Sequence, residues 1–136
     1  MSAEIKHIAL DWERGMIFRG GAPDGPSVII DGDNVQAPGP MLTLLLAAAS
    51  CTGSDVVMIL EKMRVELRQL RIEVHGTRRE EAPRRYTAIR FEFRLAGGGL
   101  DEAKARRAID LSLEKYCSVV ASLAPDTAFS YGLTLA

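Results

Sequence analysis

The stretch that decides the fold is residues 40–60, PMLTLLLAAASCTGSDVVMIL, the longest apolar run in the chain. Proline suits the first turn of a helix, and the leucines and alanines that follow it are strong helix formers. Four residues recur at spacings of four, three and four and so share one helix face, namely Leu44, Ala48, Cys51 and Asp55. Because that face carries small residues, a second backbone can come close to it. We therefore predict a central helix with a thiol in its middle.

This central helix is predicted to run from about residue 40 to about residue 68. Gly53 in its interior costs roughly 1 kcal/mol relative to alanine. Residues 52–55, TGSD, have the composition of a helix start, so we expect a kink or a break at this point. Asp55 is then expected to cap the second segment, and the alternative is a hydrogen bond close to the Cys51 thiol.

The composition is that of a single globular domain, residues 1–136, with 47% hydrophobic and 26% charged residues. A formal net charge of −1 gives no reason to expect nucleic acid or an anionic membrane as a partner. The N-terminal residues lack the apolar core of a signal peptide. Since residues 50–55 are polar or small, we expect no apolar segment of the ~18 residues that a membrane span needs. The prediction is a cytoplasmic protein, in which two cysteines are reduced or redox-cycling rather than a structural disulfide.

Alternating apolar residues predict strands on both sides of the central helix. Ile8, Leu10 and Trp12 are expected on the buried side of the first strand. The predicted strands cover residues 5–12, 16–19, 27–31, 70–75, 89–95 and 129–135, and a helix or helix pair covers 101–123. Charges alternating along 71–75 and 90–94 predict one solvated sheet face with cross-strand ion pairs. The order of elements indicates an α+β fold, and a dinucleotide-binding fold is excluded because strands and helices do not alternate around a glycine-rich loop.

A second thiol, Cys117, follows 66 positions after Cys51, also on a helical pattern. Peroxides are cleaved by thiolates, and a cysteine with the unperturbed pKa of about 8.5 is only a few per cent ionised at neutral pH. Apolar surroundings disfavour a thiolate, so a cation is required from another part of the fold. Candidates are Arg14, in a turn, and Arg78 or Arg79, in a charged loop. Without such a cation, Cys51 is a small hydrophobic core residue.

No metal site and no cofactor are predicted. His7 and His75 are the two histidines, and together with the two cysteines they do not show a zinc-ligand spacing. Glu114, three residues before Cys117, is interpreted as a solvated helix residue rather than a site residue.

Several segments together resemble the OsmC/Ohr superfamily of thiol-dependent proteins, and most of all its YhfA-like subgroup. The matching segments are APGPM (37–41), LLLAAASC (44–51), DVVMIL (55–60), RREEAP (78–83) and DLSLEKYCSV (110–119). The resemblance covers essentially the whole chain. It implies an α+β fold in which antiparallel sheets wrap around two central helices. It also implies an intertwined homodimer with active sites at the subunit interface.

In the peroxide-reducing members of this superfamily, one cysteine attacks the hydroperoxide and a second resolves the sulfenic acid. The resemblance assigns these roles to Cys51 and Cys117. Those members also have a glutamate after the proline at the helix start, where this chain has Met41. They use an arginine in the turn after the first strand, for which Arg14 is the nearest match and Arg19 the second.

The resulting hypothesis is a thiol-dependent hydroperoxide reductase in oxidative-stress defence, regenerated by an external dithiol. An apolar pocket lined by Met41, Leu44 and Leu45 is expected to favour organic hydroperoxides. The alternative is a non-enzymatic dimer that binds a small apolar ligand and has inert cysteines, which Met41 in place of a carboxylate favours. A third hypothesis is a stress-associated protein without small-molecule chemistry.

Overall fold

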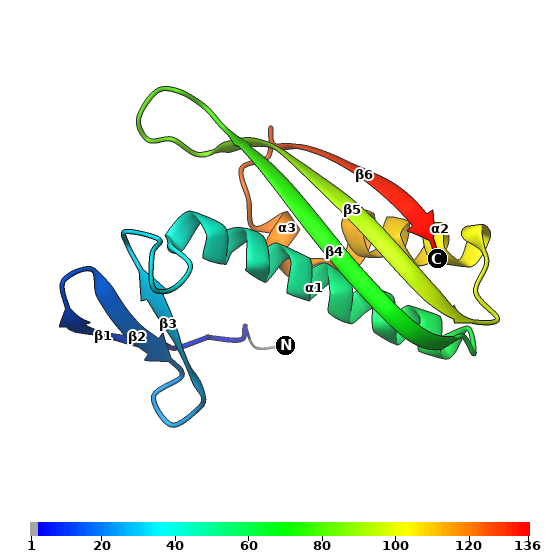
Figure 1. Cartoon of the computed structure of the whole chain (residues 1–136), viewed down its shortest axis with the longest axis horizontal. Helices are drawn as coiled ribbons and strands as arrows, with labels where there is room; N and C mark the ends of the chain where they lie inside the picture. The colour runs from blue at the N-terminus through cyan, green and yellow to red at the C-terminus, as the bar shows by residue number, and fades with distance from the viewer. Residues whose placement is uncertain (1–2) are drawn as a thin grey trace. The chain divides into compact units, whose positions relative to one another are not determined.

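The computed structural model describes residues 3–136 and contains two three-stranded sheets and a long central helix (Figure 1). In chain order the elements are β1 (Ala9–Arg14), β2 (Ile17–Gly21), β3 (Ser27–Asp31), α1 (Pro40–Lys62), β4 (Glu66–Arg78), β5 (Tyr86–Gly98), α2 (Glu102–Leu111), the π-helical turn η1 (Ser112–Tyr116), α3 (Ser118–Ala121) and β6 (Ala128–Leu135). The predicted α+β class and the order of elements are confirmed. The chain divides into two compact units at Leu44/Leu45.

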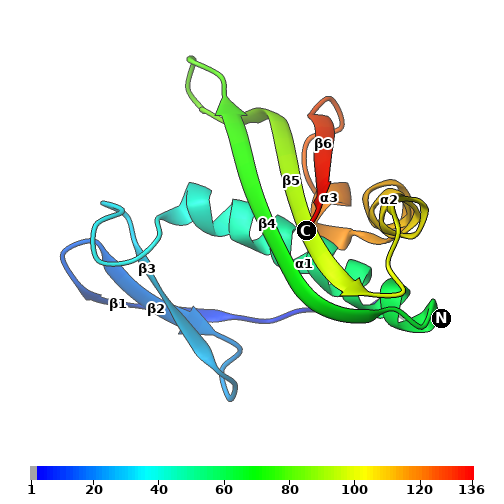
Figure 2. The ribbon, with the colours of Figure 1, turned by 45° about the vertical axis from the view of Figure 1, so that its right-hand side comes forward.

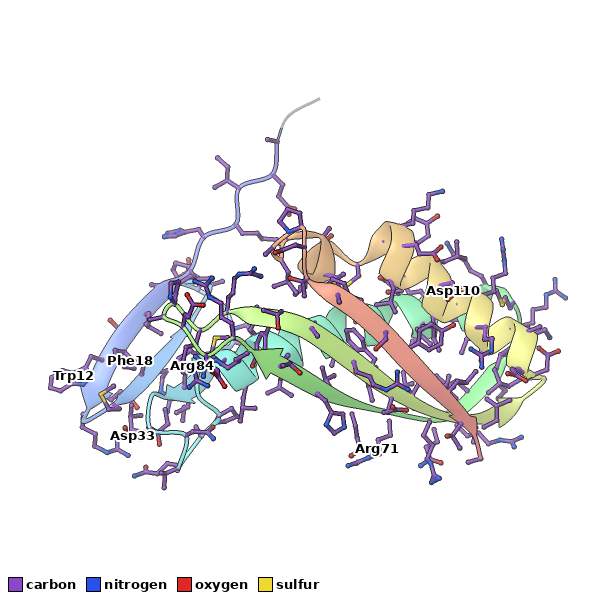
Figure 3. The ribbon with its side chains drawn as sticks, turned by 90° about the horizontal axis from the view of Figure 1, so that it is seen from above. Trp12, Phe18, Asp33, Arg71, Arg84 and Asp110 are labelled. Atoms are coloured by element: carbon purple, nitrogen blue, oxygen red, sulfur yellow. The ribbon has the colours of Figure 1, made fainter. Side chains whose placement is uncertain are left out.

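The N-terminal unit contains the antiparallel sheet β1-β2-β3. Strand β3 has the predicted bounds, whereas β1 begins at Ala9 instead of residue 5. The prediction that Ile8, Leu10 and Trp12 are half-buried is wrong for the single chain, because all three are exposed, Trp12 by 65%. Trp12 projects away from the sheet (Figure 3). The period of two correctly predicted a strand, but none of the described residues of the N-terminal unit covers its apolar side.

The connection from β3 into α1 is organised by Asp31, which is buried at the end of β3. Its carboxylate accepts hydrogen bonds from the backbone N–H groups of Asp33 (2.8 Å), Val35 (3.1 Å) and Gln36 (2.8 Å). These hydrogen bonds hold the pKa of the Asp31 carboxyl below its usual value. A single ionised side chain thereby fixes the path of the loop that leads to the central helix.

The C-terminal unit contains the second sheet, in the order β4-β5-β6. Strands β4 and β5 form an antiparallel hairpin, but β6 runs parallel to β5, with Phe91 opposite Tyr131. The expectation that the sheets are purely antiparallel is therefore wrong for β6. A crossover through α2 and α3 returns the chain to the same end of the sheet, so β6 enters in the direction of β5 (Figure 2).

One face of β5 supplies much of the core of this unit. Phe91, Phe93 and Leu95 alternate toward the interior and are at most 2% exposed. Phe91 and Phe93 stack with their ring centroids 5.9 Å apart, and Tyr131 of β6 contacts Phe93 edge-on. The cleanest alternating pattern in the sequence thus corresponds to the most completely buried strand face.

Helix α1 is continuous through Gly53, so the predicted kink or break is wrong. A Cβ atom at residue 53 would lie 3.2 Å from Cδ1 of Ile72, on β4. Gly53 therefore permits close approach of the helix to the sheet, and burial of the helix face compensates for the low helix propensity of glycine.

The end of α1 at Lys62, several residues before the predicted end, is a Schellman motif. Arg64 adopts a left-handed conformation (φ 62°), and its N–H bonds to the Glu61 carbonyl while the Val65 N–H bonds to the Leu60 carbonyl. Leu60 and Val65 are both buried, as the hydrophobic contact of this motif requires. Glu66 and Arg68, which the prediction placed in the helix, instead lie in the first residues of β4.

The outer face of β4 and β5 carries the predicted charges, but the prediction of cross-strand ion pairs is wrong. The register places Arg71 opposite Arg94 and Glu73 opposite Glu92, so like charges face each other. The ion pairs run along each strand instead, Arg71–Glu73 at 3.9 Å and Arg90–Glu92 at 2.6 Å. Arg71 and Asp110 of α2 lie on opposite sides of this sheet (Figure 3).

The length and hydropathy of α1 also correct one expectation from the sequence. Over an 18-residue window its mean hydropathy is 1.7, which is sufficient by length and composition for a membrane span. The polar residues 50–55 include only one charge and do not lower the mean enough to exclude it. A core helix passes the same test, and α1 buries Leu45, Val56 and Leu60 within the chain.

Candidate functional site

Two thiols that are far apart in the sequence meet in the C-terminal unit. Cys51 lies in the middle of α1 and is half-buried, whereas Cys117 lies directly before α3 and is buried. Their sulfur atoms and a carboxylate oxygen of Asp55 all lie within 4.8 Å of one another. Both cysteines are free thiols. The arrangement places a half-buried thiol, a buried thiol and an acid at one point.

The sulfur of Cys117 is held by two hydrogen-bond donors. The Thr52 hydroxyl donates to it at 3.3 Å, and the backbone N–H of Val120 donates at 3.5 Å, so Cys117 caps the first turn of α3. Burial raises the pKa of the Cys117 thiol most, and the neighbouring Cys51 raises it further. The two hydrogen bonds lower this pKa, but the net shift is upward. Cys117 is consequently a protonated thiol at neutral pH.

Asp55 belongs to this cluster and not to a helix cap. The hydroxyl of Ser112, which is buried, donates to Oδ2 of Asp55 at 2.8 Å. Since α1 continues through this position, the predicted capping role of Asp55 is wrong, and the alternative of a polar contact beside the thiol describes it. One helical turn separates Asp55 from Cys51, which brings both side chains to the same part of the helix face.

The π-helical turn η1 aligns the other half of the site. The Cys117 N–H bonds to the Ser112 carbonyl at 2.8 Å, across five residues instead of four. This inserted residue places Ser112 beside Asp55 while Cys117 reaches Thr52 and Cys51. Such π-turns are frequently found at functional sites. The sequence showed that Asp55 lies one turn after Cys51, but neither the π-turn nor the role of Ser112 had a recognisable pattern.

The candidate cations occupy different surroundings. Arg14, at the end of β1, donates to Oε1 of Gln36 at 3.4 Å, and Arg19 pairs with Glu13 at 3.2 Å. Both arginines lie in the N-terminal unit. Arg78 and Arg79 donate to the carbonyls of Arg84 and Pro83, each at 2.7 Å. The latter two arginines thus order the β4–β5 loop, while Arg14 contacts only a neutral amide among the contacts described.

The three residues expected to bind substrate lie in the first turns of α1. Met41 and Leu44 are half-buried, and Leu45 is buried. A Cβ atom built on Gly76 would lie 3.1 Å from Cδ2 of Leu45, so Leu45 packs on the hairpin β4–β5. Glu114 is exposed, in agreement with its interpretation as a solvated residue.

An open apolar groove runs between a second stripe of α1 and strand β4. Its volume is about 630 Å³, and Leu46, Val57 and Met58 on its helix side are all exposed. The groove is lined by Leu46, Ala49, Ser50, Gly53, Ser54, Val57, Met58, Leu70 and Ile72. An apolar groove of this size on one chain is a surface suited to a partner or a ligand.

Comparison with known proteins identifies the family of this chain. The OsmC-like protein family matches residues 31–131, which include α1 and both cysteines. This chain belongs to the OsmC-like family. Protein YhfA of Escherichia coli strain K12 is 40% identical to it over 124 residues, covering 90% of this chain and 89% of YhfA.

Solved structures have the same fold as this chain. A hypothetical protein from Aquifex aeolicus VF5 is 30% identical, with a TM-score of 0.87 and 98% of each chain covered. An organic hydroperoxide resistance protein OsmC from Legionella pneumophila has a TM-score of 0.68 at 11% identity, covering 97% of this chain and 99% of that one. At that identity the second comparison shows the fold alone. The predicted superfamily and fold are confirmed.

Proposed function

We propose that this OsmC-like protein is a thiol-dependent reductase of organic hydroperoxides, acting as a single domain within a homodimer. The observation that carries the proposal is the convergence of the Cys51 and Cys117 sulfur atoms to within 4.8 Å. Free cysteines are often inert and buried, but two sulfur atoms brought this close from distant segments have the arrangement that a redox pair needs. Family membership supports the same conclusion.

The different exposure of the two thiols supports a different role for each. Cys51 is half-buried and therefore the thiol that a substrate can reach, whereas Cys117 is buried, hydrogen-bonded and protonated. The Cys51 thiolate attacks one peroxide oxygen, the O–O bond breaks, and an alcohol leaves with a proton. The sulfur of Cys117 then attacks the Cys51 sulfenic acid, the S–O bond breaks, and water leaves as the disulfide forms. An external dithiol returns both cysteines to the reduced state.

Arg14 is the proposed partner of the Cys51 thiolate. The guanidinium of Arg19 is already paired with Glu13, while Arg14 contacts the neutral side chain of Gln36. A cation beside a cysteine favours the thiolate. Arg14→Ala is expected to slow hydroperoxide consumption by about tenfold or more, a loss of ~1.4 kcal/mol in transition-state stabilisation per factor of ten. Arg19→Ala is the matched control and is expected to change the rate less than Arg14→Ala.

The homodimer proposal rests on apolar side chains that the single chain leaves exposed. They are found on β1, β3 and the groove side of α1, and include Leu10, Trp12, Val28, Leu46 and Met58. Large apolar side chains exposed together on one unit often mark a surface that another protein covers. A second copy of the chain is the cover that the family fold implies, and sedimentation equilibrium of the purified protein tests it.

The central experiment measures consumption of cumene hydroperoxide by the reduced protein with an excess of dithiol. Cys51→Ser is expected to abolish turnover, whereas Cys117→Ser is expected to react once and retain a sulfenic acid, detected by mass spectrometry after dimedone labelling. Ser50→Ala is the matched control, because Ser50 is exposed next to Cys51 and its hydroxyl bonds only to the Ala47 carbonyl, at 3.1 Å, among the contacts described. Equal turnover by Cys51→Ser and the parent protein would refute the reductase proposal.

The second candidate function is binding of a small apolar ligand without chemistry, which the groove of about 630 Å³ favours. Alkylation of Cys51 by iodoacetamide in a Cys117→Ser background separates the two candidates. Rapid alkylation at pH 7 supports the reductase. Alkylation that rises only near the unperturbed cysteine pKa of about 8.5 supports the binding function.

A further inference from the structure

The dithiol cluster has the composition of a metal site, although the spacing of histidines and cysteines in the sequence predicted none. The Cys51 and Cys117 sulfur atoms and a carboxylate oxygen of Asp55 all lie within 4.8 Å of one another. Two sulfur ligands and one oxygen ligand converge from two segments of the fold. Asp55 supplies the third ligand, and a spacing pattern of histidines and cysteines alone does not include a carboxylate.

The distances are close to those of a tetrahedral zinc site. Zinc binds thiolate at about 2.3 Å and carboxylate oxygen at about 2.0–2.2 Å, which places neighbouring ligand atoms ~3.5–3.8 Å apart at tetrahedral angles. Ligand atoms within 4.8 Å of one another therefore need to approach by at most about 1.3 Å. Cys51 and Asp55, both on α1, are half-buried rather than enclosed.

Hydrogen bonds from outside the cluster already orient two of the three ligands. The Ser112 hydroxyl donates to Asp55 at 2.8 Å, and the Thr52 hydroxyl donates to the Cys117 sulfur at 3.3 Å. Both donors are buried. Metal sites characteristically have such partners, which fix the ligand orientation and add about 10–100-fold to metal affinity or activity. The ligands and their supporting donors form one connected group rather than three isolated side chains.

We propose that the reduced protein binds one Zn²⁺ per chain through Cys51, Asp55 and Cys117. Thiolate ligands select Zn²⁺ over Mg²⁺ and Ca²⁺, which prefer oxygen alone. Water completes the tetrahedron, because three protein ligands leave the fourth position open.

Zinc binding and hydroperoxide reduction exclude each other, a consequence that rests on the proposed function. The lone pair of the Cys51 thiolate that attacks a peroxide oxygen is the one that binds the metal. Conversely, oxidation of the two thiols by one hydroperoxide yields a disulfide, an alcohol and water, and removes both thiolate ligands. Zn²⁺ therefore protects the reduced pair, and oxidation releases Zn²⁺.

The first experiment titrates Co²⁺ and Zn²⁺ into the full-length protein, reduced with a phosphine and kept free of peroxide. One Co²⁺ per chain is expected, with thiolate-to-cobalt charge-transfer absorption and the intense d–d bands of four-coordinate cobalt. Zn²⁺ should abolish both signals, and competition with a chromogenic chelator gives its affinity. Absence of the charge-transfer absorption, or its presence without dependence on Cys51, would overturn the proposal.

Variants test each ligand and each supporting donor. Cys51→Ser and Cys117→Ser should each lower Zn²⁺ affinity by more than ~100-fold, beyond the ~10–100-fold expected for the supporting donor in Thr52→Val. Asp55→Asn should lower the affinity by at least ~10-fold. Ser54→Ala is the matched control, since Ser54 is exposed on α1 and its hydroxyl bonds to the Ser50 carbonyl at 2.8 Å. Far-UV circular dichroism identifies any variant that fails to fold. If Cys117→Ser fails to fold, Cys51→Ser still tests the proposal, because Cys51 is only half-buried.

The failure of this proposal and that of the reductase are distinguishable. Metal binding is measured without peroxide, and hydroperoxide consumption is measured with a chelator in excess. Zn²⁺ binding without turnover refutes the reductase only, and turnover without Zn²⁺ binding refutes the metal site only. If both occur, stoichiometric Zn²⁺ should inhibit turnover, and a hydroperoxide should release Zn²⁺ from the loaded protein.

Discussion

The two units of this chain bury their apolar strand residues to very different degrees. In the C-terminal unit the inward face of β5 is closed, with Phe91 fully buried. In the N-terminal unit every residue of β1 is exposed, and Trp12 retains 65% of its surface. The first region is stabilised by packing within the chain, whereas the second presents exposed apolar side chains. The candidate thiols belong to the first region, so the site is built on the part that the chain stabilises by itself.

The largest expected effect is loss of stability when the closed region is opened. Phe91→Ala removes a fully buried ring that stacks on Phe93, and large-to-small changes of this kind cost about 3–5 kcal/mol. Chemical denaturation followed by circular dichroism measures the loss. Phe18→Ala on the half-buried β2 is the comparison and should cost less. If both variants lose equal stability, the two regions do not differ in the way their burial indicates.

The next effect is expected in association rather than in folding. Trp12→Ser on β1 removes a large exposed aromatic side chain, the residue type that most often dominates interfaces. Its effect should appear as at least a tenfold weaker dimer, corresponding to ~1.4 kcal/mol. Sedimentation at several protein concentrations measures this, and Asp11→Ala on the same strand is the control. A Trp12→Ser protein that dimerises like the parent would show that another surface forms the interface.

The sequence predicted those features that depend on local pattern. A short apolar run located β3, alternation located β5, and the run of residues 40–60 located α1. It wrongly predicted that Trp12 is covered, since a period of two identifies an apolar face but not its partner. It also did not predict that β6 runs parallel to β5, or that like charges face each other across β4 and β5, because register and direction depend on how distant segments meet.

The candidate site also combines residues that the sequence predicted with contacts that it did not. Cys51 and Cys117 were identified from their types and from the resemblance of the surrounding residues to a family. Their proximity, and the contact of Asp55 with Ser112, depend on a single extra residue in a π-turn that joins two helices. Propensity rules describe regular helices, so an irregularity of one residue is outside their reach. Asp55 was misassigned because Gly53 suggested a break, and only the contact with β4 explains why the helix continues.

A smaller effect is expected at alkaline pH in the C-terminal unit. Burial raises the pKa of the Cys117 thiol above its usual 9.0, so folding favours the neutral form. The corresponding stability is fully present below pH 9 and is lost as the pH rises through the folded-state pKa. The free energy of unfolding should therefore fall above about pH 9, and in Cys117→Ser it should fall less. Tyr131, whose pKa is also raised by burial, contributes at still higher pH, so Tyr131→Phe separates its share.

The smallest expected effect is a local loss of stability in the N-terminal unit at acid pH, opposite in its pH dependence to that of Cys117. Three backbone hydrogen bonds lower the pKa of Asp31, so its contribution is present above the usual value of 3.8 and is lost as the pH falls through the lowered folded-state value. Amide hydrogen exchange by NMR should then show loss of protection at Asp33, Val35 and Gln36, whose N–H groups bond to this carboxylate. Asp31→Asn should remove the pH dependence, while Asp33→Asn should leave it. The loop leads directly into Pro40, so the Cys51 alkylation rate should be measured over the same pH range. An unchanged rate would show that the C-terminal unit keeps the thiol site intact without the ordered loop. A change of the thiol site at the same pH would mean that the two units do not respond separately.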